Sequence, residues 1–260
     1  FDSRGIPTVE AEVFLEDGSS ASAIVPSGAS TGKHEAFELR DLENKEYLGK
    51  SVLNSVKNIN GTIFKNLKNF DIFDQRKLDN ALIDLDGTKQ KNKLGANSIL
   101  AVSMATCKVA AISKKISLFK YLGGNTNNQM PLPLMNIING GAHANNSLRI
   151  QEFMIRPERP KTFSESIRIC FLVIQKLKSL INNKKLSTTV GDEGGFAPSL
   201  NTNEEAIEFI IEAIEKSGFK IGEEVSICLD VAANELYKES KYSIQSSKFE
   251  SIENTIDYYL

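Results

Sequence analysis

The nine residues Val190-Gly191-Asp192-Glu193-Gly194-Gly195-Phe196-Ala197-Pro198 place two adjacent carboxylates between glycines and next to an apolar segment. Glycine lets the backbone adopt positive φ and approach a ligand closely, so such a turn can direct an acidic side chain into a cavity. The same residue types also form ordinary exposed turns. The rest of the chain has to decide between these two interpretations.

Apolar runs on both sides of this turn predict strands that end in polar residues. Pro131 to Ile138 and Phe153 to Ile155 are two such runs, and a β-branched run from Val225 to Leu229 ends at Asp230. Short apolar runs bounded by turn residues are typical of buried strands. A helix is expected between the second and third runs, at about residues 162–182.

A second helix is expected at about 203–217. Asn203 is its candidate N-cap, Glu204 and Glu205 lie in the positive first turn, and Gly218 is the expected stop. Strands that alternate with helices indicate a parallel or mixed sheet covered by helices. In barrels of this kind, chemistry gathers at one rim, on loops and strand ends.

Four polar groups fall on these loops and strand ends: His143, the pair Gln151-Glu152, the pair Asp192-Glu193 in its glycine turn, and Asp230. Each has an ordinary alternative explanation, such as a hydrogen-bonded loop histidine, an exposed strand-edge charge or a helix cap. Together they predict a carboxylate-rich pocket with one imidazole. Carboxylate oxygens are the ligands that Mg²⁺ prefers.

The N-terminal part of the chain begins with an alternating pattern. Apolar and acidic positions alternate from Val9 to Leu15, and Asp17-Gly18 then precedes an apolar stretch, Ala21 to Val25. This pattern predicts a β-hairpin with one solvated face. The small residues at 26–34 predict a mobile loop, whose glycine spacing does not fit a Walker A phosphate loop.

Residues 50–122 are expected to be mainly helical, most clearly from Leu94 to Lys115, where apolar and small residues mix. A helix of that composition is expected to pack closely on several sides. The Gly- and Asn-rich cluster at 123–128 breaks the pattern and is the expected domain boundary.

The composition excludes several classes of protein. Of the 260 residues, 41% are hydrophobic, and 31 basic and 33 acidic residues leave a formal charge of -2, which gives no reason to expect nucleic acid or an anionic membrane as partner. No apolar run approaches the roughly 20 residues needed to span a bilayer. The chain has an odd number of cysteines, which lie far apart at Cys107, Cys170 and Cys228. They predict no disulfide framework and fit a reducing cytoplasm.

Eight ordered motifs resemble those of the enolase family, and the resemblance covers essentially the whole chain. They are D-S-R-G at 2–5, P-S-G-A-S-T-G at 26–32, L-D-G-T at 85–88, L-G-A-N at 94–97, N-G-G-A-H at 139–143, Q-E-F-M-I at 151–155, G-D-E-G-G at 191–195 and L-D-V-A-A at 229–233. Eight matches in one order are far more specific than any single motif.

The resemblance implies a fold with two domains. Residues 1–124 would form the α+β N-terminal domain with a lid loop at 26–34, and residues 125–260 the first part of a TIM-type α/β barrel of the enolase kind, truncated in this chain. The family's second barrel strand runs antiparallel, which would keep Gln151-Glu152 on the active rim. An incomplete barrel would leave strand edges exposed and favour aggregation.

The resemblance also implies a reaction, the dehydration of 2-phosphoglycerate to phosphoenolpyruvate in glycolysis and gluconeogenesis, catalysed by phosphopyruvate hydratase, a lyase. Glu193 resembles the general acid that protonates the departing 3-hydroxyl, aided by Glu152. Gln151 and His143 resemble residues of the substrate shell, and His143 is also expected in the catalytic group. A carboxyl crowded by others stays protonated near neutral pH, as an acid catalyst requires.

Mg²⁺ is the cofactor that the resemblance implies. Asp230 resembles the first of three carboxylates that hold the Mg²⁺ bound to the substrate carboxylate, and Ser30 resembles a lid ligand of a second ion. Gly28 and Ala29 of the same lid are expected to contact the substrate. Divalent cations stabilise the charge that builds on the substrate when a proton next to its carboxylate is removed.

The family's general-base lysine, further Mg²⁺ ligands and phosphate-binding residues cannot be assigned in these 260 residues, so we expect the chain alone to be inactive. A cytoplasmic homodimer is the family's usual state when full length. Two alternatives remain open: a non-catalytic interaction protein, and a related superfamily enzyme acting on another carboxylate. The lid motif and G-D-E-G-G make the second of these less favoured.

Overall fold

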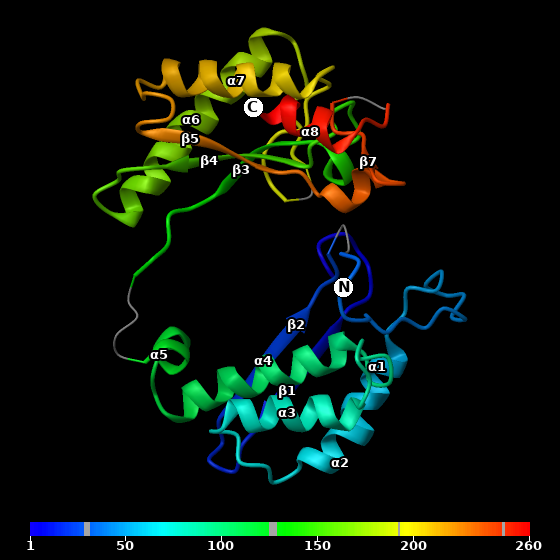
Figure 1. The fold of residues 1–260 in the computed structure, drawn as a ribbon. Coiled ribbons are helices and arrows are strands. Elements are labelled where there is room, and N and C mark those ends of the chain that lie inside the picture. The colour runs from blue at the N-terminus through cyan, green and yellow to red at the C-terminus, as the bar shows by residue number, and fades with distance from the viewer. Residues whose placement is uncertain (29–31, 125–128, 192, 246–247) are drawn as a thin grey trace. The chain divides into compact units, whose positions relative to one another are not determined.

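The computed structural model describes residues 1–260 except 29–31, 125–128, 192 and 246–247 (Figure 1). The chain divides into two compact units, Phe1–Asn128 and Gln129–Leu260. Each unit encloses its own cluster of buried apolar side chains.

Unit 1 is built on the predicted hairpin. β1 (Val9–Phe14) pairs antiparallel with β2 (Ser20–Val25). On β1, Val9 and Ala11 are buried, whereas the glutamates that alternate with them are exposed. The prediction of a hairpin with one solvated face is confirmed.

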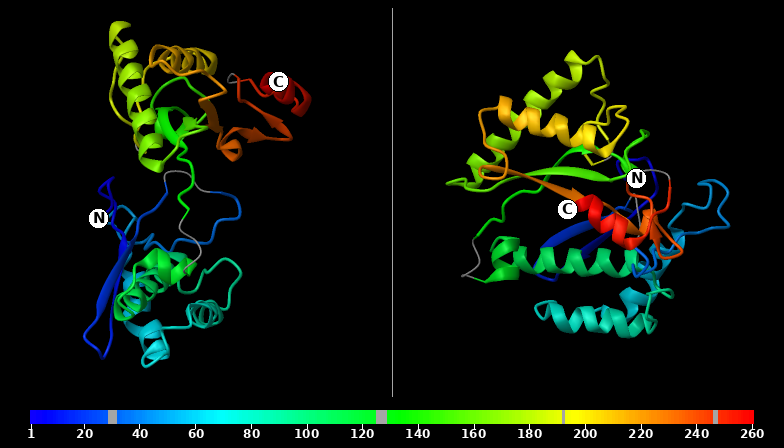
Figure 2. Two further views of the ribbon diagram at one scale, coloured as in Figure 1. Left: turned by 90° about the vertical axis from the view of Figure 1, so that its left-hand side faces the viewer. Right: turned by 45° about the horizontal axis from the view of Figure 1, so that its top comes forward.

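The long helix α4 (Ala96–Ser113) packs on this hairpin (Figure 2). Ala101, Ala105 and Ala110 are fully buried, since such small side chains let the helix approach its neighbours closely. By length and composition alone, the 18-residue helix α4 could cross a membrane. This corrects the expectation that no apolar run approaches the length needed to span a bilayer. Half of its residues are buried in unit 1, and the core helix of a soluble protein passes the same test.

The other helices of unit 1 lie in the predicted helical region, and the first three of them follow one another without a loop. They are α1 (Leu53–Asn58), a π-helical turn (Ile59–Ile63), α2 (Phe64–Leu67), α3 (Gln75–Asp86) and α5 (Leu118–Gly123).

The L-D-G-T motif ends α3. Gly87 adopts a left-handed φ of 69° at the C-cap, a conformation that glycine adopts without strain. The buried Asp86 carboxylate accepts hydrogen bonds from the N–H groups of Thr88 (2.9 Å), Lys93 (3.1 Å) and Leu94 (2.7 Å). Burial opposes ionisation of Asp86, but the hydrogen bonds outweigh it and hold its pKa below the usual 3.8.

Unit 2 contains a sheet in the order β3-β4-β5, formed by β3 (Met135–Asn139), β4 (Glu152–Pro157) and β5 (Val225–Asp230). β4 runs antiparallel to both neighbours, as the reversed second strand implies. The sequence pattern predicts a parallel or mixed sheet. In the described part of unit 2, parallel pairing occurs only as isolated bridges, such as the one between Ile138 and Phe196. In the part of unit 2 that the structure describes, the sheet is open and does not close into a barrel.

Two helices cover one face of this sheet (Figure 1), α6 (Phe163–Asn183) and α7 (Asn203–Lys216). Phe153 and Ile155 of β4 are fully buried in the core that includes these helices. Because side chains alternate along a strand, Glu152 projects to the opposite face.

Threonine residues cap both helices. Thr162 accepts from the Glu165 N–H (3.1 Å), and Thr202 accepts from the Glu205 N–H (3.2 Å). The assignment of Asn203 as N-cap is therefore wrong by one residue. Asn203 is buried, and its carboxamide accepts from Arg149 N–H and donates to the carbonyl of Ile244, so it is used in the core instead.

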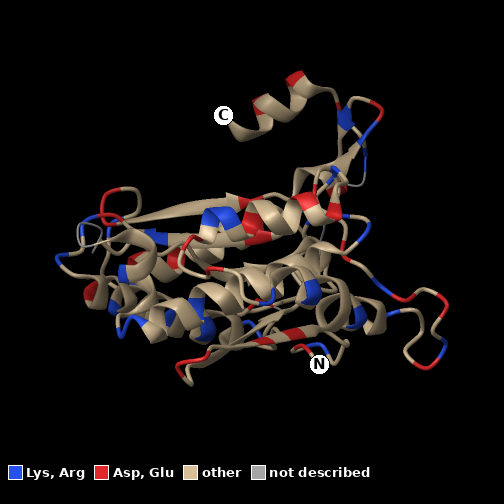
Figure 3. Ribbon diagram, turned by 90° about the horizontal axis from the view of Figure 1, so that it is seen from below, with Lys and Arg blue, Asp and Glu red and all other residues tan. Residues whose placement is uncertain are grey.

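The chain beyond β5 forms a 3₁₀ turn (Ala233–Leu236), the short pair β6 (Tyr237–Lys238) and β7 (Lys241–Tyr242), and the helix α8 (Ile252–Tyr259). Lys and Arg are interspersed with Asp and Glu along the ribbon (Figure 3), in line with the small net charge.

Replacing Thr202 with alanine is expected to lower the free energy of unfolding by about 1 kcal/mol, because the Glu205 N–H loses its capping acceptor. The midpoint of urea unfolding at unchanged slope measures this loss. Thr162→Ala is the matched substitution on α6 and should have a similar effect. An unchanged midpoint for Thr202→Ala would contradict the assignment of this residue as the cap.

Replacing Asp86 with asparagine is expected to remove a pH-dependent part of the stability. Because the pKa of Asp86 is lower in the folded chain than the usual 3.8, its contribution is present above that value and is lost as the pH falls through the folded pKa. Wild-type stability should therefore decrease more steeply in acid than that of Asp86→Asn, as measured by urea unfolding across a pH series. Parallel pH curves for the two proteins would contradict this account.

Candidate active site

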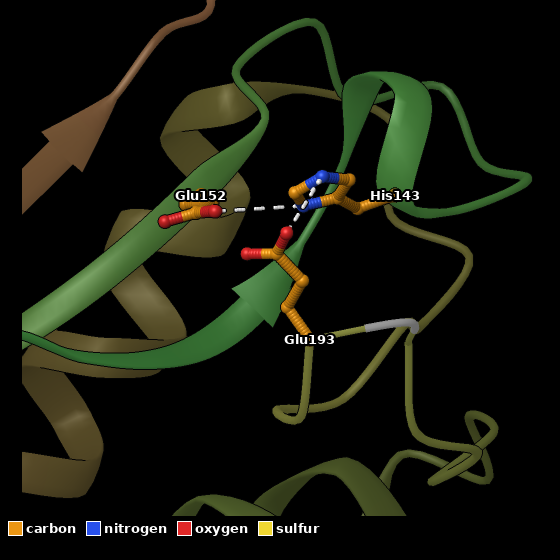
Figure 4. A group of neighbouring side chains, drawn as sticks. All are labelled: His143, Glu152 and Glu193. Atoms are coloured by element: carbon orange, nitrogen blue, oxygen red, sulfur yellow. Dashed lines mark ion pairs between the residues drawn. The ribbon is translucent and has the colours of Figure 1, made fainter. Parts of the chain in front are cut away.

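His143, Glu152 and Glu193 come together within unit 2 (Figure 4). His143 Nδ1 lies 3.5 Å from Glu152 Oε1, and His143 Nε2 lies 3.5 Å from Glu193 Oε1. The side chains are 2%, 14% and 50% exposed, respectively. A buried imidazole is thus flanked by one largely buried carboxyl group and one that reaches solvent.

His143 is positioned by the glycines that precede it. It ends a 3₁₀ turn, Gly141–His143, and its N–H donates to the Gly140 carbonyl at 3.0 Å. The Gly140 N–H donates in turn to the Gln151 carbonyl at 2.9 Å. A Cβ at Gly140 would lie 2.4 Å from the carbonyl oxygen of Ile150, so the turn can approach the segment before β4 only with glycine there.

Glu152 is positioned by strand register. It is the first residue of β4 and lies opposite Asn139 at the end of β3 and opposite Asp230 at the end of β5. Asp230 is exposed, and its Oδ1 accepts from the Ala232 N–H at 3.0 Å. The reversed direction of β4 thus places its first residue beside the last residues of two other strands.

Glu193 belongs to a compact glycine turn. The Gly191 N–H donates to the Gly195 carbonyl (3.1 Å), and the Gly194 N–H donates to the Gly191 carbonyl (3.3 Å). Gly194 and Gly195 have φ of 80° and 69°, which only glycine adopts readily. The neighbouring Asp192 lies outside the described residues.

Burial is the main reason that the pKa of Glu152 is raised from 4.5 to about 7. Hydrogen bonding with the Glu193 carboxyl group raises it further, as do the charges of Glu193 and Asp230. A proton on Glu152 removes a negative charge that would otherwise lie close to other carboxylates. The site can therefore hold a transferable proton near neutral pH.

Two buried polar atoms at this site have no hydrogen-bond partner among the described residues, His143 Nδ1 and Gln151 Oε1. Both residues are only 5% exposed. An unpartnered buried polar atom is costly. A polar ligand in contact with these atoms would remove that cost.

The side chains of this region differ in how well they suit Mg²⁺ as ligands. The potential ligand atoms of His143, Glu152 and Glu193 all lie within 4.8 Å of one another, but the group includes an imidazole nitrogen, which Mg²⁺ seldom takes as a ligand. Asp230 offers an exposed carboxylate at a strand end. Since Mg²⁺ commonly binds one or two protein carboxylates together with waters and substrate oxygens, Asp230 fits such an ion as one ligand.

The predicted lid residues belong to unit 1. The Arg4 guanidinium donates to the carbonyls of Ser27 (2.8 Å) and Gly28 (3.1 Å). Ala29 and Ser30 lie outside the described residues. The expected substrate contacts of Gly28 and Ala29 and the expected metal contact of Ser30 therefore stay predictions, as do the roles of the residues in unit 2.

Two hollows of the described chain lie away from these residues. One, of about 830 Å³, borders β1 and the helices of unit 1. The other, of about 340 Å³, lies between α7 and the end of α6. Neither is lined by His143, Glu152 or Glu193, and we assign the site by its chemistry and geometry.

Sequence reasoning gave no role to Asn139, although this residue opens the N-G-G-A-H motif. It is fully buried, and its carboxamide donates to the Gly194 carbonyl at 2.5 Å. The only signal in the sequence is its position between an apolar run and two glycines. Its contact with the Glu193 turn depends on residues 55 positions away.

Comparison with known proteins agrees with the motif resemblance. The family model described as "Enolase, N-terminal domain" matches residues 1–122, and "Enolase, C-terminal TIM barrel domain" matches residues 127–258. The enolase of Pelagibacter ubique (strain HTCC1062) is 61% identical over 259 residues, which cover 100% of this chain and 62% of that protein. The chain thus spans less than two thirds of its relative's length. The second family model alone covers about half of the chain. The chain therefore belongs to the enolase family.

Proposed function

We propose that this chain supplies the acid side of an enolase active site that dehydrates 2-phosphoglycerate to phosphoenolpyruvate, a step of glycolysis and gluconeogenesis. The observation that carries the proposal is the cluster of His143, Glu152 and Glu193, in which burial and neighbouring carboxylates raise the pKa of Glu152 to about 7. A protonated carboxyl group at neutral pH is what the departure of a hydroxyl group requires.

In the proposed reaction, a base that we do not assign among the described residues removes the C2 proton, and the electron pair left behind forms the C2–C3 double bond. The C3–oxygen bond then breaks as Glu193 donates a proton to the 3-hydroxyl oxygen, and water leaves. Glu193 suits this role because its side chain is half exposed and can meet a substrate. Glu152, the more buried of the two carboxyl groups, shares this proton through its hydrogen bond with Glu193. Gln151 orients the substrate through its buried Oε1, which has no hydrogen-bond partner among the described residues, and His143, whose Nδ1 faces Glu152, belongs to the same substrate shell.

Asp230 would hold Mg²⁺ as one carboxylate ligand. When bound, the ion stabilises the negative charge that develops on the substrate carboxylate. Enolase-superfamily sites are a known case in which a Lys or His base works together with Mg²⁺. We assign no such base among the described residues, and propose that the 260-residue chain alone is inactive.

We also propose the division into residues 1–124, the N-terminal domain with a lid at 26–34, and residues 125–260, the first part of the barrel. A cytoplasmic location and a homodimer in the full-length state follow the family's usual pattern. Neither nucleic acid nor a membrane is a proposed partner, because the formal charge is only -2.

A chimera tests the proposed reaction. Residues 1–260 would replace the matching segment of the Pelagibacter ubique enolase, and phosphoenolpyruvate formation would be followed with and without Mg²⁺. We expect activity that a chelator abolishes, and in the chimera Glu193→Gln should reduce kcat about 10²- to 10⁴-fold.

Glu158→Gln is the matched control, since Glu158 pairs with Arg156 and lies outside the cluster. It should leave kcat within about twofold, which is too small a change to reflect a lost acid. A folded but inactive chimera would overturn the proposed function. Full activity of Glu193→Gln would overturn the role of this residue.

The raised pKa of Glu152 also predicts how stability depends on pH. Since the folded pKa of about 7 exceeds the usual 4.5, the contribution is complete below 4.5 and is lost as the pH rises through about 7. Glu152→Gln, which mimics the neutral form, should remove this loss in urea unfolding of the 260-residue chain. The same decline in the variant would assign it to other groups.

A further inference from the structure

Resting on the proposed function, we propose that the carboxamide of Asn139 is a positioning group, which holds the Glu193 turn so that the Glu193 carboxyl group stays beside His143. Asn139 touches no reacting atom in this arrangement. It acts through the backbone of the turn, from the end of β3.

The Glu193 side chain cannot fix its own position. It is 50% exposed, and its ion pair with His143 spans 3.5 Å. A half-exposed side chain is placed largely by its backbone, and the two backbone hydrogen bonds described within residues 191–195 join the turn to itself.

Asn139 links the backbone of this turn to the end of β3. Its Nδ2 donates to the Gly194 carbonyl at 2.5 Å, which among the described residues is the one hydrogen bond between the backbone of residues 191–195 and a side chain outside them. The same Nδ2 lies 3.4 Å from the Phe196 carbonyl, and the Asn139 N–H donates to that carbonyl at 2.8 Å. Asn139 therefore binds the turn and the residue that follows it.

The turn also packs directly on this carboxamide. A Cβ at Gly191 would lie 2.7 Å from Asn139 Nδ2 and 2.8 Å from its Cγ. Such distances are too short for an alanine without displacement. The glycine at this position thus brings the backbone of the turn against the amide plane.

The carboxamide is itself fixed in orientation. Its Oδ1 accepts from Asn136 Nδ2 at 2.7 Å, which leaves Nδ2 to face Gly194. The Asn139 carbonyl accepts from Asn146 Nδ2 at 2.9 Å, and the same Asn146 group donates to the Pro198 carbonyl at 3.0 Å. Asparagine side chains thus tie β3, the loop after His143 and the segment after the turn to one another.

Strand register places this anchor next to the other carboxyl group. Asn139 lies opposite Glu152 in the pairing of β3 with β4. One residue therefore faces Glu152 through the ladder and the Glu193 turn through its side chain. A shift of the turn away from Asn139 would separate the two carboxyl groups.

Asn139→Ala tests this role, with Asn203→Ala as the matched control. Asn203 is another buried asparagine of unit 2, but its carboxamide bonds to Arg149, Ile150, Ile244 and Tyr258, and not to residues 191–195. In the active chimera we expect Asn139→Ala to lower kcat about 10- to 100-fold with KM changed less than about threefold, because misplacing a catalytic group by about 1 Å costs this much. Asn203→Ala should lower thermal stability but leave kcat within about twofold.

Nuclear magnetic resonance of the isotope-labelled 260-residue chain provides a readout that does not need activity. Asn139→Ala should shift the amide signals of Gly191, Gly194 and Gly195 and speed their hydrogen exchange, whereas Asn203→Ala should not. If Asn139→Ala does not fold, Gly191→Ala probes the same contact by forcing a methyl group against the carboxamide.

Unchanged kcat and unchanged turn signals in Asn139→Ala, with stability alone reduced, would overturn the positioning role. An inactive unmodified chimera would instead overturn the proposed reaction. In that case the resonance measurement still decides whether Asn139 holds the turn.

Discussion

The antiparallel register of β4 between β3 and β5 is the constraint on which the candidate site depends. It places Glu152 opposite both Asn139 and Asp230, which end the two neighbouring strands. A shift by one residue would turn Glu152 toward the core formed with α6 and α7, because side chains alternate between faces. The burial of Phe153 and Ile155 on that side makes such a shift costly, so hydrophobic packing sets the position of the acid.

Two carboxyl groups of this chain show how environment decides ionisation. Asp86 is buried but accepts hydrogen bonds from three backbone N–H groups, and these bonds lower its pKa. The same bonds hold the loop after α3 against the Asp86 carboxylate. Burial raises the pKa of Glu152, which accepts no such set of backbone N–H groups from the described part of the chain, and the Glu193 and Asp230 carboxyl groups raise it further, to about 7. The first serves structure as an ion, and the second can hold a proton for transfer.

Glycines bring the parts of the site together. Gly140 lets the His143 turn approach the segment before β4, and Gly191 lets the Glu193 turn lie on the Asn139 carboxamide. Each close approach leaves no space for a side chain on the glycine. Hydrogen bonds to the backbone then join the segments that meet there. The precision of the site therefore comes from backbone packing against β3 and β4, while the Glu193 side chain remains free to meet a ligand.

Local patterns in the sequence determined the hairpin of unit 1, the long helix α4, the strands β4 and β5, and the family, because periodicity and ordered motifs are properties of the chain itself. They also singled out His143, Glu152 and Glu193. Tertiary structure alone decided that these three meet, that Glu152 carries the raised pKa, that Thr202 rather than Asn203 caps α7, and that Asn139 holds the Glu193 turn. The Thr202 cap joins residues only three positions apart, but each of the other arrangements depends on contacts between segments far apart in the chain, which no local pattern encodes.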